Sequence, residues 1–195
     1  TILIAMEYVD GKDLRTTVEQ GRKSGARLSY ADVAYIMACS MDGLHHAHRA
    51  VDDEGTELNV VHRDFSPSNV LISYDGSVKL LDFGIAKAEA RSHKTQAGVV
   101  KGKFAYMAPE QCRAKELDHR VDVFALGVCL YEALTGRPLY RRETEFETME
   151  AIVRGPIPKL TDRMKNPPAE LEQIIKRCLA KSPDDRFSTA GELQE

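Results

Sequence analysis

The spacing of apolar residues predicts a mainly helical chain. Apolar residues recur three or four positions apart behind Ser29, which has the features of a helix N-cap because Asp32 follows in the first turn. This pattern predicts a helix that ends near Arg49. The segment 121–134 is apolar on almost every side, which indicates a central helix buried all round. Further helical patterns cover residues 13–25, 144–154, 169–180 and 188 onward.

A β-hairpin is predicted around Asp75-Gly76, a dipeptide that favours tight two-residue turns. Apolar and β-branched residues flank this dipeptide on both sides, as expected for two short strands. If the dipeptide forms the whole loop, paired positions sum to 151 and Asn69 faces Asp82. Asp64 lies five residues upstream of Asn69, near enough to share this open end of the hairpin.

These three polar residues predict a metal site. Asn69 and Asp82 offer hard oxygen ligands of the kind that suits Mg²⁺, which takes one or two protein oxygens and completes its shell with water and phosphate oxygens. Asp64 would accept the proton of an attacking hydroxyl, or orient that hydroxyl. Each residue alone is explained as readily by a turn or a helix cap. Their shared register favours the metal site.

Three ordered motifs resemble those of protein kinases. His-Arg-Asp-Phe-Ser-Pro-Ser-Asn at 62–69 resembles the catalytic loop, and Leu-Asp-Phe-Gly at 81–84 resembles the metal-binding loop. Met-Ala-Pro-Glu at 107–110 resembles the end of the activation segment. The order and spacing match, and the loop sequences are most similar to those of eukaryotic-like bacterial serine/threonine kinases.

The resemblance covers essentially the whole chain and implies its layout. Residues 13–195 would form the larger, C-terminal lobe of the kinase fold, mainly α with short β-hairpins, and 1–12 the last strand of the smaller lobe and the hinge. The activation segment would span 82–110 and the buried central helix 121–135. Both ends look cut, and we expect the rest of the smaller lobe, with its glycine-rich loop and nucleotide-pairing lysine, to be missing. The chain alone would then transfer little phosphate.

The resemblance also implies roles at matching positions. Asp64 would orient the substrate hydroxyl and accept its proton, while Asn69 and Asp82 would hold the Mg²⁺ that bridges the phosphates of ATP. Nucleotide contacts are implied at the gatekeeper Met6, at the hinge backbones of Glu7 and Val9, at Asp13 beside the ribose and at Leu71 beneath the base.

Further matching positions are architectural. Asp122 lies in the central helix, where a buried carboxylate needs hydrogen-bond donors, and the resemblance implies the backbone near His62 and Arg63 as its partner. Arg63 also matches an arginine that commonly contacts an activation-loop phosphate. Glu110 and Arg186 match an ion pair that ties the activation segment to the last helices.

The sequence departs from the family pattern at three positions. Ser66 stands where these kinases usually carry a lysine that contacts the transferred phosphate, and Lys103 stands where they carry a threonine. We expect Lys103 to supply the charge that Ser66 lacks; the alternative is that Lys103 points to solvent and transfer is slower. Val99 occupies the usual phosphorylated position, which leaves Ser92 and Thr95 as alternative acceptors.

Composition excludes several other classes of protein. Lys and Arg number 27 against 30 Asp and Glu, a net charge of −3 that gives no support for binding nucleic acid or an anionic membrane. The four cysteines are far apart and form no C-x-x-C pair, which favours a reducing, cytoplasmic setting. No uncharged run is long enough to span a bilayer and no signal peptide is recognised, although an anchor outside this segment is compatible with the sequence. His45 and His48 share a helix face but have no clear further metal ligands.

The sequence therefore predicts a protein serine/threonine kinase that uses ATP and Mg²⁺ to phosphorylate a protein substrate. The alternative is a pseudokinase, a scaffold that binds partners through the same fold. Intact residues Asp64, Asn69 and Asp82 favour the enzyme, whereas Ser66 favours the scaffold. The substrate, the activating signal and the oligomeric state are left open.

Overall fold

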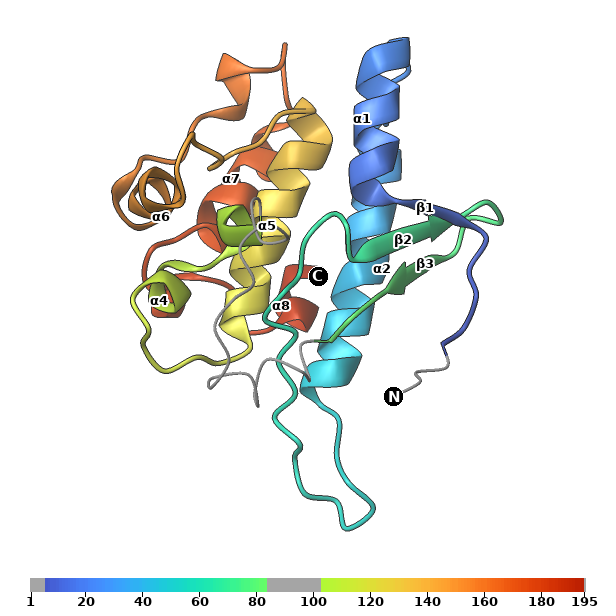
Figure 1. Cartoon of the computed structure of the whole chain (residues 1–195), viewed down its shortest axis with the longest axis vertical. Helices are drawn as coiled ribbons and strands as arrows, with labels where there is room; N and C mark the ends of the chain where they lie inside the picture. The colour runs from blue at the N-terminus through green and yellow to red at the C-terminus, as the bar shows by residue number, and fades with distance from the viewer. Residues whose placement is uncertain (1–5, 84–102, 195) are drawn as a thin grey trace.

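The computed structural model describes residues 6–83 and 103–194, which form a helical body with a small sheet on one side (Figure 1). The helices are α1 (Leu14–Ser24), α2 (Tyr30–His48), α4 (Pro109–Cys112), α5 (Arg120–Thr135), α6 (Glu145–Arg154), α7 (Ala169–Cys178) and α8 (Ala190–Gln194). The strands are β1 (Gly11–Asp13), β2 (Val70–Ser73) and β3 (Val78–Leu80), and short 3₁₀ helices are η2 (Lys103–Tyr106), η3 (Leu160–Asp162) and η4 (Pro183–Asp185). The mainly helical fold class is confirmed.

Side-chain caps explain where the long helices begin. The hydroxyl of Ser29 accepts a hydrogen bond from the Asp32 amide at 3.1 Å, while the Asp32 carboxylate accepts one from the Ser29 amide at 2.8 Å. This reciprocal capping box satisfies two backbone donors at the start of α2. Thr144 and Glu147 form the same arrangement at α6, and Asp13 caps α1. The predicted helix starts are therefore confirmed to within one or two residues.

Helix α5 is the centre of the core. Nearly all of its side chains are buried, and it packs against α2 on one side and α7 on the other (Figure 1). Gly127 permits close approach to α7, because a Cβ there would lie only 2.5 Å from the Cβ of Cys178. The prediction of a central helix surrounded by protein is confirmed.

The sheet differs from the predicted hairpin in register and in strand number. Its order is β1-β2-β3, all antiparallel, and Ile72 pairs with Val78, so that paired positions sum to 150 instead of 151. The Ser73 amide donates to the Ser77 carbonyl at 2.9 Å, which leaves a three-residue turn in which Gly76 has a φ of 93°. Only glycine adopts this φ readily, and Gly76 thereby allows the turn to contain three residues instead of two. The predicted two-residue loop was therefore wrong.

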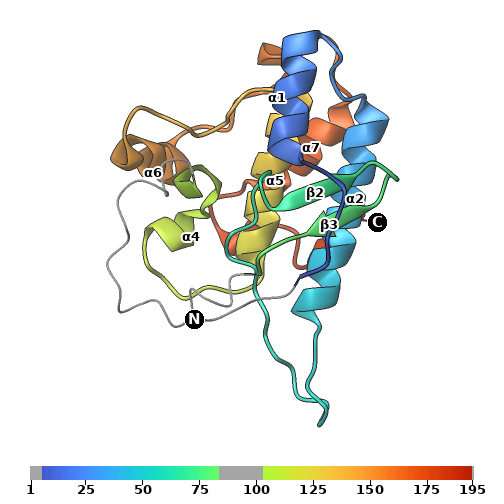
Figure 2. The same ribbon diagram turned by 45° about the vertical axis from the view of Figure 1, so that its right-hand side comes forward.

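Strand β1 was not predicted, because Gly11-Lys12-Asp13 has no strand-forming residue and is ordered by pairing with β2. Figures 1 and 2 both place the sheet against α2, which agrees with the packing of α2 on β3. The predicted last strand of the smaller lobe, within 1–12, lies partly outside the described residues, and residues 6–10 have no regular structure.

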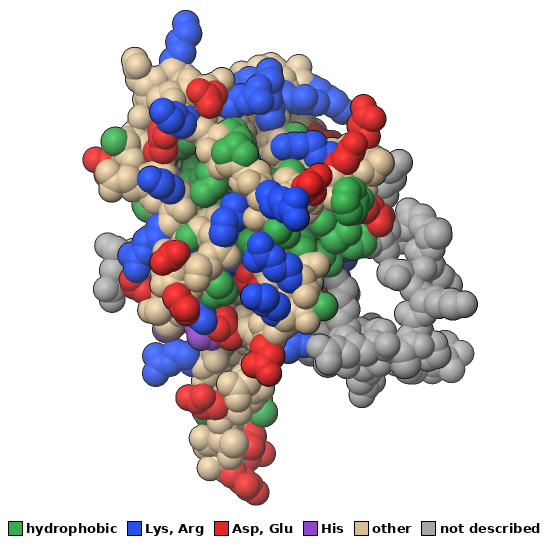
Figure 3. All heavy atoms as spheres, turned by 90° about the vertical axis from the view of Figure 1, so that its left-hand side faces the viewer, with side chains coloured by type: hydrophobic (Ala, Val, Ile, Leu, Met, Phe, Trp, Pro, Cys, Tyr) green, Lys and Arg blue, Asp and Glu red, His purple; other side chains and the backbone are tan. Residues whose placement is uncertain are grey.

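A long loop projects from the body between α2 and the catalytic-loop motif (Figure 2). Its residues 51–59 are exposed, and an isolated bridge between Val51 and Glu57 closes it. On the face shown in Figure 3, basic and acidic side chains are interspersed. Within residues 6–83 and 103–194, no helix is both long and apolar enough to cross a membrane.

Candidate active site

One buried carboxylate holds the loop at residues 62–69 in place. Asp122, in the first turn of α5, is 1% exposed and accepts hydrogen bonds from the backbone amides of His62 at 2.8 Å and Arg63 at 2.9 Å. These are the partners that the resemblance implied. Nε2 of His48 lies 2.8 Å from the same carboxylate, a contact that the sequence did not predict. The three donors offset the cost of burying the carboxylate.

Arg63 and Asp82 share an unusual backbone conformation. Their φ angles are 61° and 53°, in the left-handed region that residues with a side chain rarely adopt. His62 links the two segments, because its Nε2 donates to the Leu81 carbonyl at 3.0 Å and its ring packs against Phe83 at 4.6 Å between centroids. The loop at 62–69 and the motif that begins at Leu81 are therefore joined next to both strained positions.

Asn69 is oriented by the loop that contains it. Its side-chain Nδ2 donates to the Asp64 carbonyl at 2.9 Å, and its own amide donates to the Ser66 carbonyl at 2.9 Å. Because the amide nitrogen is used in this contact, Oδ1 is the atom that remains able to ligate a cation. Asn69 lies opposite Leu81 in the strand register, and not opposite Asp82 as the two-residue loop had implied.

The donor set at this end of the hairpin fits Mg²⁺. One amide oxygen, at Asn69, and one exposed carboxylate, at Asp82, are the few hard ligands that this ion takes from a protein. Within the described ranges no three or more His, Cys, Asp or Glu side chains are grouped as a metal site. His48 contacts Asp122 rather than a set of metal ligands.

Lys103 reaches the same loop from a distant part of the chain. It opens η2, and its Nζ donates to Oδ2 of Asp64 at 2.5 Å. The Asp64 side chain is 12% exposed and that of Lys103 is 42% exposed, so the ammonium extends from solvent to a largely buried carboxylate. Ser66, two residues beyond Asp64, is 2% exposed. The solvent-pointing alternative for Lys103 is not what the structure describes.

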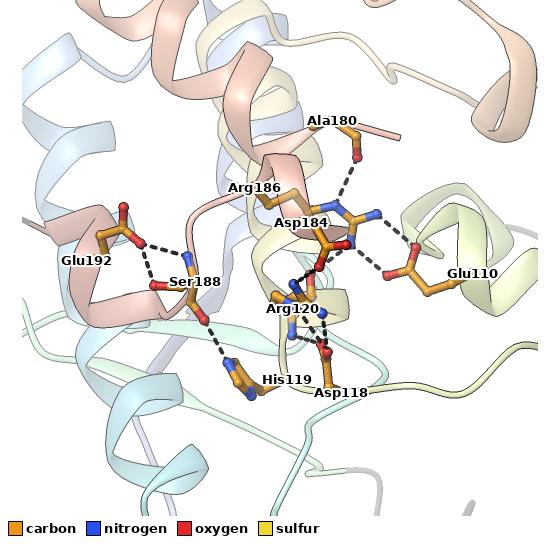
Figure 4. A network of polar contacts seen from close by, with 9 residues as sticks. All are labelled: Glu110, Asp118, His119, Arg120, Ala180, Asp184, Arg186, Ser188 and Glu192. Carbon is orange, nitrogen blue, oxygen red and sulfur yellow. Dashed lines mark hydrogen bonds and ion pairs between the residues drawn. The ribbon is translucent and has the colours of Figure 1, made fainter. Parts of the chain in front are cut away.

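A second ion pair joins the end of the motif at 107–110 to the last helices (Figure 4). Arg186 donates from Nη1 to Glu110 Oε1 at 2.6 Å and from Nη2 to Oε2 at 2.8 Å. The same guanidinium donates to the carbonyls of Ala180 at 2.9 Å and Arg120 at 3.0 Å. Both charged side chains are almost fully buried. This two-pronged contact is the geometry in which an arginine–carboxylate pair is strongest, and it is the pair that the resemblance implied.

The structure brings only some of the implied nucleotide positions together. Asp13 pairs with Leu71 across β1 and β2, so these two lie side by side. The carboxylate of Asp13 also accepts from the Thr16 amide at 2.9 Å, which makes it the cap of α1. Met6 is 74% exposed and Glu7 is exposed too, with its carboxylate 3.4 Å from Lys79 Nζ. Val9 is half-buried.

Two polar contacts near the site were not predicted. Gln111 bridges the two motifs, because its Nε2 donates to the Arg63 carbonyl at 3.3 Å and its Oε1 accepts from the Ala108 amide at 2.7 Å. The Tyr106 hydroxyl donates to Glu132 Oε2 on α5 at 2.7 Å. Burial raises the pKa of Glu132, and the hydrogen bonds from Tyr106 and from the Leu139 amide oppose that rise. No local pattern marks either contact, since both join distant segments.

Part of the predicted activation segment lies outside the described residues. Ser92, Thr95 and Val99 all fall in 84–102. Phosphorylation of Ser92 or Thr95, and contact of such a phosphate with Arg63, therefore stay predictions.

Comparison with known proteins agrees with this geometry. The family model for the protein kinase domain matches residues 1–195. The chain is 46% identical over 190 residues to tyrosine-protein kinase MasK of Myxococcus xanthus, covering 96% of this chain and 29% of MasK. It is 36% identical over 194 residues to serine/threonine-protein kinase PknB of Mycolicibacterium smegmatis, covering 98% of this chain and 29% of PknB.

A probable serine/threonine-protein kinase of Corynebacterium efficiens is 36% identical over 196 residues, covering 97% of this chain and 28% of that protein. The chain thus spans a little under a third of the length of the curated relatives it matches. These relatives are bacterial kinases, and the family model extends over every residue. The chain belongs to the protein kinase family.

Proposed function

We propose that these residues form the catalytic lobe of an enzyme that transfers the γ-phosphoryl group of ATP to a serine or threonine hydroxyl of a protein substrate. One observation carries the proposal: Asn69 donates to the Asp64 carbonyl within a loop whose backbone Asp122 holds. A proton acceptor and a metal ligand are thereby positioned together before any substrate arrives. Such positioning provides most of the catalysis in phosphoryl transfer.

Each residue has a separate task in this proposal. Asp64 orients the substrate hydroxyl and accepts its proton, and Asn69 Oδ1 and the Asp82 carboxylate hold the cation. Mg²⁺, when bound, neutralises charge on the phosphates of ATP. Asp13 and Leu71, which are paired across the sheet, are assigned to the ribose and the base. Met6, Glu7 and Val9 are assigned to the adenine end of the nucleotide.

The choice of serine and threonine as acceptors rests on sequence. Pro67 follows the catalytic aspartate where tyrosine kinases carry a different loop pattern, and PknB is named a serine/threonine kinase. MasK is named a tyrosine kinase, and so the acceptor has to be identified directly. The four cysteines are free thiols, which supports a reducing cytoplasmic setting.

We also propose that the 195 residues alone transfer phosphate at a negligible rate. The sequence contains no G-x-G-x-x-G loop to cover the phosphates of ATP. The half of the nucleotide site formed by Asn69, Leu71 and Asp82 would need a second segment opposite it. Comparing the isolated segment with the complete protein in one assay checks this directly.

The test of the proposed function is Mg²⁺-dependent transfer of labelled phosphate from ATP by the complete protein that carries this segment. Asp64→Asn should lower turnover by roughly 10²–10⁴-fold, the usual contribution of a positioned proton acceptor. Asp42→Asn changes an exposed aspartate on α2 and should leave turnover unaltered. Phosphoamino acid analysis of the product should give phosphoserine or phosphothreonine.

Other outcomes would lead to different conclusions. Phosphotyrosine as the main product would overturn the acceptor but keep the kinase. Nucleotide binding without any transfer by the wild-type protein would favour a pseudokinase, the function that Ser66 suggests. Chelation of Mg²⁺ with no loss of transfer would contradict the roles given to Asn69 and Asp82.

A further inference from the structure

We propose that Lys103 is a catalytic residue that contacts the transferring phosphoryl group and supplies the positive charge that the catalytic loop itself lacks. The inference rests on the proposed function and adds a residue to it from outside the loop. Its starting point is the contact of 2.5 Å between Lys103 Nζ and Asp64 Oδ2, which joins residues 39 positions apart. The proposed proton acceptor, Asp64, and the Lys103 ammonium are therefore in direct contact.

The backbone that carries Lys103 is fixed by its neighbours in η2. Ala105 is 2% exposed and Tyr106 is 6% exposed, and both belong to the core. The Tyr106 hydroxyl donates to Glu132 of α5 at 2.7 Å, so that the 3₁₀ turn is tied to the central helix. A charge presented from a packed element needs little reorganisation during reaction, which is what electrostatic catalysis requires.

The Lys103 ammonium has capacity for a second anion. Lysine carries three N–H donors, and the contact with Asp64 uses one of them. Its side chain is 42% exposed, whereas that of Asp64 is 12% exposed. The ammonium is therefore more accessible to solvent than the carboxylate that it contacts, and a phosphoryl group beside Asp64 would be within its reach.

The loop and hairpin contain two other cations. Between residues 62 and 82 the lysine and arginine residues are Arg63 and Lys79. Lys79 lies on β3 with its Nζ 3.4 Å from Glu7. The backbone amide of Arg63 donates to Asp122, and its side-chain Nε is buried without a hydrogen-bond partner among the described residues. Among the described lysine and arginine residues, Lys103 has its ammonium on the Asp64 carboxylate.

The proposed step conserves charge and atoms. The substrate oxygen forms a bond to the γ-phosphorus as its proton passes to Asp64, and the bond from phosphorus to the bridging oxygen breaks, with its electron pair leaving on ADP. Lys103 keeps its proton throughout. Its ammonium takes no part in bond making or breaking. It stabilises negative charge on the oxygens of the transferring phosphoryl group, and one well-placed donor of this kind raises kcat roughly 10²–10³-fold.

The test compares charge and shape at position 103 in the complete protein. Lys103→Met keeps the length of the side chain and removes the charge, and we expect kcat to fall roughly 10²–10³-fold with the ATP KM within about twofold. Lys103→Arg should retain more activity than Lys103→Met. Adding Ser66→Lys to Lys103→Met should recover at least about tenfold in kcat, because it returns a charge to the loop. Lys115→Met, at an exposed lysine after α4, is the matched control and should match wild type.

A binding measurement separates catalysis from folding. Calorimetry with ADP and Mg²⁺, with and without aluminium fluoride as a mimic of the transferring group, should show that Lys103→Met loses affinity for the mimic alone. That loss should be of the same order as the fall in kcat, because a transition-state contact is absent from the ADP complex. The melting temperature of Lys103→Met should equal that of Lys115→Met.

The outcomes distinguish this inference from the proposed function. A wild-type protein with no transfer would reject both. An active wild type in which Lys103→Met keeps kcat within about twofold would reject Lys103 alone, and so would equal losses of affinity for ADP and for the mimic. A fall in kcat matched by a lower melting temperature, with no recovery from Ser66→Lys, would make Lys103 a structural residue and would also reject the inference.

Discussion

Glu132 is an acidic side chain placed against the core, where it accepts hydrogen bonds from the Tyr106 hydroxyl and the Leu139 amide. Burial raises its pKa above the ordinary value of 4.5. A raised pKa means that the folded state holds this proton more tightly than the unfolded chain does. The contribution to stability is therefore complete below pH 4.5 and is lost as pH rises through the pKa of the folded state.

We predict that Glu132→Gln reduces the loss of unfolding free energy that occurs as pH rises from about 4.5 through the raised pKa of the folded state. Glutamine keeps the shape of the side chain and does not titrate, so the part of the pH slope that comes from this carboxyl should disappear. Urea unfolding at several pH values measures the slope. Glu116→Gln, at an exposed glutamate, should leave the wild-type slope in place; equal slopes in wild type and Glu132→Gln would contradict the prediction.

At the scale of single residues, the sequence points to candidate site residues most clearly where a motif marks them. Asp64, Asn69 and Asp82 are proposed from their motifs, and the partners of Asp122 were predicted from the resemblance. His48 could not be predicted, because its contact with Asp122 spans 74 positions and its helix face gives no sign of that partner. Gln111 is similar, since its contact with Arg63 depends on how two distant loops pack.

Among the elements, α5 and α7 depend on one glycine for their close approach. A Cβ at Gly127 would lie 2.5 Å from the Cβ of Cys178, which no side-chain rotation relieves. We predict that Gly127→Ala lowers the unfolding free energy by about 1–2 kcal/mol, the cost of overpacking less the gain in helix propensity. Chemical denaturation measures this change.

Gly43 of α2 provides the matched control for that substitution. A Cβ there would meet Leu80 Cδ1 at 2.9 Å, and this atom is the far end of a flexible side chain on β3. Gly43→Ala should therefore change the unfolding free energy by less than about 0.5 kcal/mol, because Leu80 can rotate. If both substitutions had the same effect, helix propensity rather than helix packing would govern Gly127.

The elements that the sequence predicted are those with local causes. Ser29 and Thr144 cap their helices with side chains that lie within three residues of their partners, and the starts of α2 and α6 followed. The register of β2 and β3 could not be predicted in the same way. Asp75-Gly76 is compatible with a two-residue or a three-residue turn, and the pairing of Ser73 with Ser77 decides between them.

For the molecule as a whole, the reactivity of the four free thiols depends on how deeply each one is buried. Cys129 and Cys178 are fully buried on α5 and α7, whereas Cys39 and Cys112 are partly exposed. Burial raises the pKa of Cys178 to about 12 and that of Cys112 to about 11. Because the thiolate is the reactive form, burial suppresses reaction twice, through access and through ionisation.

We predict that a thiol reagent labels Cys39 first and Cys112 more slowly. Cys129 and Cys178 should be labelled together, at a rate that follows global unfolding. Mass spectrometry of samples quenched at increasing urea concentrations measures the order. A Cys39→Ser variant should lose only the fast phase. Labelling of Cys129 ahead of Cys178, at a rate independent of urea, would mean that α5 opens locally.

The anchoring of the catalytic loop by Asp122 has a consequence for the order in which the protein is made. The carboxylate follows His62 by 60 positions, so at a synthesis rate of about 5–20 residues per second the ribosome adds it roughly 3–12 s after the loop. During that interval the amides of His62 and Arg63 cannot yet donate their hydrogen bonds to Asp122. The newly made chain therefore acquires the described geometry of the loop at 62–69 only after the start of α5 has been translated, however early the motif itself emerges.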